Sequence, residues 1–201
     1  MKMFLSIIAI ITLTIVFIAN LVGSEMYEFE GGNNNNYQSA QNITSPETIK
    51  FIYGSLGRGQ DTVDYYALVF KQYTPQVSVA LLVTQDSPET FRPNLIFIDP
   101  NSNHMIGQAP YGVPENMGGR IFEWPSVSNI KLENREAFEK FIVGPQLIKD
   151  MSDTHYLVAV YDPQGKGGKY TLQIGAKRPE NSFKTKVHNL WSIVRIKLRL
   201  Y

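Results

Sequence analysis

The chain has three histidines, the residue type best suited to acid–base chemistry near neutral pH. His104, His155 and His188 stand far apart in the chain, and none belongs to an H-E-x-x-H pair, which would place two zinc ligands on one helix face. The sequence has no G-x-S-x-G nucleophile elbow and no phosphate-binding loop. It also has no cysteine, which excludes disulfides and thiolate chemistry. We therefore expect no enzymatic activity and no cofactor.

A turn rich in oxygen-bearing side chains follows the apolar run at 95–98. Asp99, Asn101 and Asn103 occupy alternating positions, a spacing similar to the start of a calcium-binding loop. Such a loop needs a glycine at its sixth position, where this chain has His104, and a glutamate at its twelfth, which is absent here. The three residues are weak calcium candidates. The alternative, which we favour, is that they cap the turn by bonding to its own backbone.

Aromatic and basic side chains form the remaining candidate sites. Large aromatic residues often anchor protein partners, although more of them fill the core of a domain. The segment 184–201 contains five lysine or arginine residues and no acidic residue. The net charge of the whole chain is only +1, which gives no case for nucleic acid as a partner. The candidate partner-binding residues are Tyr111, Trp124, Trp191, Arg195, Lys197 and Arg199.

The N-terminal residues 3–24 contain no charged side chain. As a helix of about 1.5 Å per residue this run is roughly 33 Å long, which is enough to cross a hydrocarbon core about 30 Å thick. Lys2 precedes the run and Glu25 follows it, so the positive-inside rule places the remainder of the chain outside the cytoplasm. We expect an uncleaved single-pass anchor. A cleaved signal peptide is the alternative, although Val22-Gly23-Ser24 is a poor cleavage site.

The rest of the chain predicts a flexible linker over 25–46 and an all-β domain over 47–180. The linker is polar and contains four successive asparagines, 33–36. In the domain, short runs of β-branched and aromatic residues alternate with turn signals, which is typical of a jelly-roll-like β-sandwich. The expected strands are 48–56, 63–71, 77–84, 95–98, 120–124, 156–161 and 169–174, the last two forming a hairpin across a glycine-rich loop.

Two further elements complete the expected organisation. One short helix is predicted over Asn134–Phe141, with Asn134 as its cap and Gly144-Pro145 beyond its end. The basic C-terminal tail, 181–201, contains a run in which apolar and basic residues alternate from Val194 onward. A period of two favours a strand, at a sheet edge or paired with another chain.

The run 54–174 resembles the bacterial pre-peptidase C-terminal domain and related exported prokaryotic β-sandwich proteins. The matching segments are Gly54-Ser55-Leu56, Asp61–Tyr66, Val77–Val83, Leu95–Pro100, Tyr156–Tyr161 and Gly168–Ile174. The insertion between Gly107 and Thr154 is longer than that family's pattern. The resemblance implies a β-sandwich accessory module for adhesion, ligand binding or assembly, without catalysis of its own.

Taken together, these features predict a non-catalytic, extracytoplasmic accessory or structural subunit of a membrane or cell-envelope assembly. It would be held in the membrane by residues 3–24 and would bind protein partners through its sandwich and tail. The alternative is a glycan-binding module, with or without calcium. A groove lined by tryptophan or tyrosine would favour a sugar, and a flat apolar patch would favour a protein.

Overall fold

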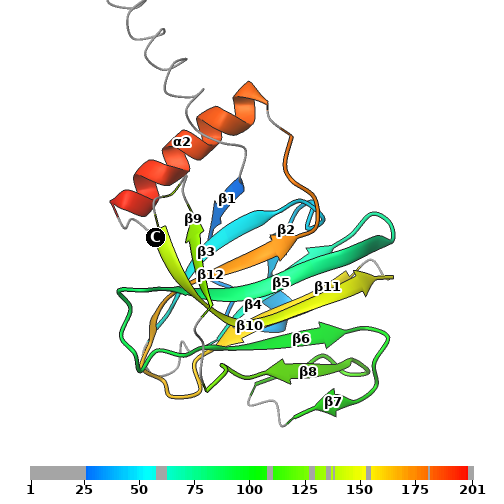
Figure 1. Ribbon diagram of the computed structural model, residues 1–201. Helices are drawn as coiled ribbons and strands as arrows, with labels where there is room; N and C mark the ends of the chain where they lie inside the picture. Colours follow the sequence, from blue (N-terminus) through cyan, green and yellow to red (C-terminus); the bar gives the residue numbers. More distant parts are fainter. Residues whose placement is uncertain are drawn as a thin grey trace, which may run out of the picture.

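A computed structural model describes residues 26–57, 63–107, 111–126, 130–134, 137, 139–152, 155–180 and 182–198. Within these residues the chain forms two six-stranded sheets, packed face to face as a β-sandwich, with one α-helix against the first sheet (Figure 1). The predicted anchor, 3–24, and the tail residue Arg199 lie outside the described residues. No helix of the described part is long and apolar enough to cross a membrane.

The strands fall into two sheets whose orders follow from their backbone pairing. The first sheet has the order β1 (Met26–Phe29), β3 (Lys50–Leu56), β12 (Gly168–Gly175), β5 (Thr74–Thr84), β10 (Glu139–Met151) and β9 (Lys131–Asn134). The second has the order β2 (Gln41–Ile43), β4 (Val63–Val69), β11 (His155–Tyr161), β6 (Asn94–Asp99), β8 (Gly118–Phe122) and β7 (Met105–Ile106). Each of the seven predicted strands is present, with shifts of a few residues at its ends.

Both faces of each sheet are covered, which explains why the strands are apolar almost throughout. On β5, Val79 and Leu81 point into the core between the sheets, whereas Ala80 and Leu82 belong to a second cluster on the outer side of the first sheet. Residues of the 105–121 segment pack over the outer side of the second sheet. The sandwich therefore has a central core and two outer apolar layers.

The predicted hairpin of β11 and β12 is wrong. β11 pairs with β4 and β6 in the second sheet, and β12 pairs with β3 and β5 in the first. The glycine-rich loop between them crosses from one sheet to the other. Buried Asp162 holds this loop by accepting hydrogen bonds from the backbone N–H groups of Gln164, Lys166 and Gly167. The glycine-rich loop predicts a local hairpin, but each of the two strands instead pairs on both of its sides with strands that are distant in the sequence.

The predicted short helix over Asn134–Phe141 is also wrong, since β9 ends at Asn134 and β10 begins at Glu139. The two strands form an antiparallel pair in which Glu139 lies opposite Asn134. Asn134 does cap the intervening turn, because its Oδ1 accepts a hydrogen bond from the N–H of Ala137. The β structure is favoured because β10 places Phe141 fully buried in the cluster outside the first sheet and pairs along β5.

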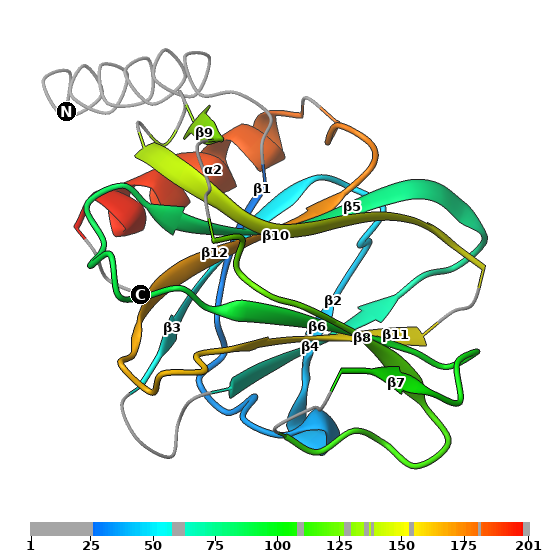
Figure 2. The ribbon, with the colours of Figure 1, turned by 60° about the horizontal axis from the view of Figure 1, so that its bottom comes forward.

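The predicted strand in the C-terminal tail is instead helix α2 (Phe183–Lys197). Ser182 caps its start, its side chain accepting a hydrogen bond from the N–H of Thr185. The helix lies along the outer side of the first sheet (Figure 2), where Ile196 is buried and Ile193 is half-buried in the outer cluster. A helix brings both isoleucines to that one surface, which a strand cannot do, because residues three apart on a strand face opposite sides.

The predicted flexible linker, 25–46, is largely structured from residue 26 onward. It contributes β1 to the first sheet and β2 to the second, each parallel to its neighbour. Buried Lys50 ties this segment to the sandwich through an ion pair of 2.5 Å between its Nζ and Oε1 of Glu28, and it also donates to the carbonyl of Thr44. Within the described residues the domain therefore extends from β1 through α2.

Candidate functional site

A groove runs between β8 of the second sheet and β10 of the first. Three adjoining cavities of about 750, 540 and 450 Å³ share lining residues along it. We call this surface the edge groove. Its lining includes Arg92, Arg120, Phe122, Trp124, Ile148 and Lys149. It lies where the two sheets meet, beside the short strands β9 and β7 that end them.

Trp124 occupies one end of the edge groove. Its backbone N–H donates to Oδ1 of Asn94 over 2.8 Å, which fixes the segment after β8 to the start of β6. The Arg92 guanidinium lies over its ring at 5.4 Å from the centroid. A Cβ atom added to Gly144 would lie 2.3 Å from a ring carbon of Trp124, so only a glycine fits there. The ring is therefore enclosed by Arg92 and by the backbone of β10.

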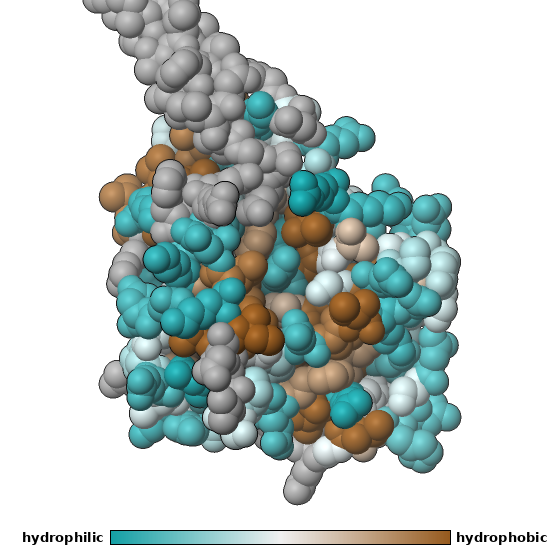
Figure 3. Space-filling model, viewed as in Figure 1, coloured by the Kyte–Doolittle hydropathy of each residue, from teal (hydrophilic) through white to brown (hydrophobic). Residues whose placement is uncertain are grey.

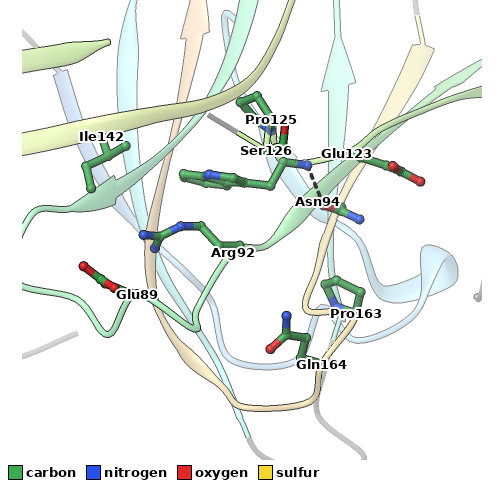
Figure 4. Close-up of a pocket in the computed structure, with 10 residues that line it drawn as sticks. Glu89, Arg92, Asn94, Glu123, Pro125, Ser126, Ile142, Pro163 and Gln164 are labelled. Atoms are coloured by element: carbon green, nitrogen blue, oxygen red, sulfur yellow. Dashed lines mark hydrogen bonds between the residues drawn. The ribbon is translucent and has the colours of Figure 1, made fainter. Parts of the chain in front are cut away.

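The surroundings of this end are polar. Figure 4 shows the Arg92 side chain directed toward the side of Ile142 and Glu89, with the Glu123 carboxylate on the other side. Gln164, in the loop held by Asp162, forms the far rim. The groove end thus combines one enclosed aromatic ring, one cation and two carboxylates.

The same arrangement of cation over aromatic ring recurs twice more along the groove. Arg120 lies over Phe122 at 5.2 Å, and the Lys149 ammonium lies over Phe97 at 5.9 Å. Lys149 also forms an ion pair of 2.7 Å with Asp99. Such contacts hold a positive charge at an apolar surface without burying it. The floor of the edge groove is therefore apolar and its surface carries bases.

Exposed isoleucines flank this floor. Ile106, Ile130 and Ile148 are between 60% and 73% exposed and come from three different segments. Figure 3 shows hydrophobic side chains gathered on this face of the molecule, over the region between β10 and the β6–β8 edge. Exposed apolar side chains grouped on one face mark interaction sites more often than single exposed residues do.

Tyr111, the second aromatic candidate, lies away from the edge groove. Its ring packs at 5.5 Å, edge to face, against Tyr161 in the apolar layer outside the second sheet. Tyr65 belongs to the same layer, and its hydroxyl donates to the carbonyl of Gly112. Burial, with the nearby Tyr111 and Tyr37 phenols, raises the pKa of Tyr65 to about 12. Tyr111 thus contributes to packing over this sheet.

The candidates in the tail are brought together on α2. Trp191 is 69% exposed on the outward face of the helix. The Arg195 guanidinium lies 3.9 Å from the ring centroid of Phe29 on β1, and Lys197 is exposed in the last turn. The structure therefore separates the described sequence candidates into three places, namely the edge groove, the outer layer of the second sheet and α2.

The candidate calcium ligands form a turn after β6. Oδ1 of Asp99 accepts a hydrogen bond from the backbone N–H of Asn101, and its Oδ2 is paired with Lys149. Asn101 and Asn103 are exposed. Among the described residues no group of three or more His, Asp or Glu side chains is arranged to hold a metal ion. The contacts of Asp99 match the turn-capping interpretation.

The three histidines lie on separate elements. His104 and His155 are exposed, the first before β7 and the second at the start of β11. His188, on α2, has its Nε2 at 3.2 Å from the carbonyl oxygen of Tyr27 on β1. Their positions give no constellation of the kind that acid–base or metal chemistry uses.

A polar network inside the sandwich was not anticipated from the sequence. Tyr170 on β12 donates a hydrogen bond of 2.7 Å to Oδ2 of buried Asp64 on β4, and its hydroxyl is 2.5 Å from that of Tyr66. Burial is the main reason that the pKa values of both tyrosines are raised well above 10, with the Asp64 carboxyl adding to the effect. The network joins the two sheets, and it is enclosed. The adjacent Asp64, Tyr65 and Tyr66 in a strand that is otherwise apolar were the available signal.

Comparison of the sequence with protein-family models and with curated proteins gives no match. The relationship to the pre-peptidase C-terminal domain therefore stays a prediction.

Proposed function

We propose that this protein is a non-catalytic accessory subunit of a membrane or cell-envelope assembly, and that its edge groove binds an extended segment of a partner protein. The observation that carries the proposal is the groove itself, with three cation-covered aromatic rings along its floor and three exposed isoleucines beside them. The partner segment would supply apolar side chains to the isoleucines and carboxylates to Arg92, Arg120 and Lys149. The extracytoplasmic location rests on the apolar run 3–24 and belongs to the same proposal.

The strand order supports a jelly-roll-like arrangement as part of this proposal. Without the edge strands β1, β2, β7 and β9, the sheets read β3-β12-β5-β10 and β4-β11-β6-β8. Successive strands then alternate between the sheets except at β6 and β8, which is the order of a double-sheet jelly roll. In this order β10 and β8 end their sheets on the same side, and the edge groove lies between them.

The proposal is tested with a photo-crosslinking residue placed at Ile106 or Ile148, on opposite sides of the groove, in the full chain expressed in its own host. We expect the same adduct, of the same mass, from both positions. Exposed Ser55 on β3, near the other edge of the first sheet, is the matched control and should give none. Adducts that are absent, or equal at all three positions, contradict the proposal. A protein that leaves the membrane in mild detergent only as a lone monomer contradicts it as well.

Glycan binding is the second candidate, and the Trp124 ring in a groove is the observation that favours it. A sugar stacks on an open aromatic face, however, and here Arg92 and the Gly144 backbone both lie against the ring. Soluble polysaccharides are therefore expected to leave Trp124 fluorescence unchanged. Saturable quenching in a Trp191→Phe background, stronger in Arg92→Ala because that change uncovers the ring, would support the glycan function instead.

A further inference from the structure

Helix α2 presents apolar residues on the side that faces away from the sandwich. Trp191, Val194 and Leu198 are 69%, 40% and 62% exposed. Their spacing of three and four residues places them on one side of the helix. The opposite side, with Asn189, Ser192 and Ile196, is buried. Three exposed apolar side chains grouped on one side of a helix are a candidate interaction surface.

The charge on α2 restricts what this occupant can be. The helix Phe183–Lys197 contains no acidic residue, and Arg195 and Lys197 lie in its last turn beside the apolar face. Tryptophan and arginine side chains beside exposed aliphatic residues are the composition of helices that lie in the membrane interface, where bases meet anionic lipid headgroups.

The position of α2 in the fold agrees with this composition. α2 packs against β1, where Ile196 joins the cluster that contains Tyr27, and Arg195 covers Phe29. β1 begins at Met26, and in the sequence only Glu25 separates Met26 from the apolar run 3–24. Two residues of chain reach at most about 7 Å. If that run ends at the membrane surface, the strand beneath α2 begins there too.

We propose that the outward face of α2 lies in the membrane–water interface and binds anionic phospholipid headgroups through Arg195 and Lys197. This contact would be a second attachment in addition to residues 3–24, and it rests on the membrane placement proposed above. It would orient the outer side of the first sheet toward the lipid. The edge groove, on a different side of the sandwich, would remain open to a partner.

The chain has no cysteine, so single cysteine variants can each carry one fluorescent label. Full-length Leu198→Cys and the control Ile106→Cys, which is 64% exposed in the edge groove on the second sheet, are labelled with nitrobenzoxadiazole. Each is reconstituted into phosphatidylcholine vesicles with a minor fraction of phosphatidylglycerol. Flotation reports insertion, and quenching by lipids spin-labelled near the headgroup reports contact with the interface. We expect both variants to float and only the label at position 198 to be quenched, more strongly with phosphatidylglycerol than without it.

The other outcomes separate the two proposals. If both variants float and neither label is quenched, or both are quenched equally, the membrane placement stands and the role of α2 is refuted. A chain that does not float contradicts both. Substitution of Arg195 and Lys197 by glutamine should abolish the response to phosphatidylglycerol while flotation continues. A response that is unchanged in this variant overturns the assignment of the headgroup ligands.

Discussion

Replacing Tyr170 by phenylalanine tests whether the buried network holds the two sheets together. The substitution keeps the ring and removes one oxygen. Two groups then lose a partner, because the Asp64 carboxyl accepts from this hydroxyl at 2.7 Å and the Tyr66 hydroxyl lies 2.5 Å from it. All three side chains are at least 97% buried, so water cannot replace the missing oxygen without a structural change.

The expected loss follows from these contacts. Leaving a buried polar group without its partner costs about 1–3 kcal/mol, and more when the group is charged. Relaxation of the backbone is limited, since a Cβ on Gly54 would already lie 2.5 Å from the Tyr170 ring. With two partners affected, we expect Tyr170→Phe to lower the free energy of unfolding by about 2–4 kcal/mol, a large part of the roughly 5–15 kcal/mol that is typical of a domain.

The measurement is urea unfolding of the full chain in mild detergent, followed by near-ultraviolet circular dichroism. Tyr73→Phe is the matched control, because its hydroxyl also donates to a carboxyl oxygen, Oδ2 of Asp150 at 3.0 Å, but on an exposed side chain. That variant should unfold at the same urea concentration as the parent. If Tyr170→Phe is no less stable than Tyr73→Phe, the reasoning about buried hydrogen bonds in this fold is refuted.

Three further changes are expected to affect stability. The folded-state pKa values of Tyr66 and Tyr170 are raised above 10, so at alkaline pH the folded protein keeps protons that the unfolded chain releases. The free energy of unfolding is therefore undiminished below about pH 10 and falls above it, by about 1.4 kcal/mol per pH unit for each tyrosine. Urea midpoints that do not fall across this alkaline range would contradict the assignment. Gly144→Ala should destabilise the fold by about 1–3 kcal/mol and shift the tryptophan emission, because the added methyl group overlaps the Trp124 ring. Gly165→Ala is the control: its Cβ position is open, but its φ is positive, so it should cost stability through backbone strain alone and leave the emission unchanged. Asp162→Ala leaves three backbone N–H groups without their acceptor and should cost about 2–4 kcal/mol of stability, measured by thermal unfolding. Asp162→Asn should show an intermediate loss. Equal losses in the two variants would show that the carboxylate is not what holds the loop.

The two proposed contact surfaces lie on different sides of the sandwich. α2 covers the outer side of the first sheet, and the edge groove opens between β8 and β10. A membrane contact and a protein contact could therefore be made at the same time. Losing one surface should leave the other functional, which the crosslinking and quenching experiments can measure in the same variants.

Several sequence predictions failed for one physical reason. The hairpin of β11 and β12, the helix at 134–141 and the strand in the tail were inferred from neighbours in the sequence. In each case contacts with distant residues decided the outcome, as when Phe141 became buried along β5 and Ile196 became buried beside Tyr27. The asparagine-rich segment was predicted to be a linker because it is polar. It is structured because its backbone forms hydrogen bonds with the edges of the two sheets, for example from the N–H of Tyr65 on β4 to the carbonyl of Asn34.

The candidate site was predictable in part. The sequence singled out Trp124 as a contact residue, and it does line the edge groove. It could not indicate that Arg92 and Gly144 enclose the ring, or that Ile106 and Ile148 flank one surface, because these residues come from different strands and loops. Trp191 and Arg195 were recognised from composition, but which of them faces outward depends on the helix that replaced the expected strand.

The sequence by itself determined that this chain is built mainly of strands, because runs of β-branched and aromatic residues separated by turn residues have few other ways to bury their side chains. It also determined the positions of those strands to within a few residues. Only the tertiary structure decided which sheet each strand joins, that both outer faces are covered and where the groove opens. Those features depend on pairing and packing between residues far apart in the chain, whose free energy is not encoded in any local pattern.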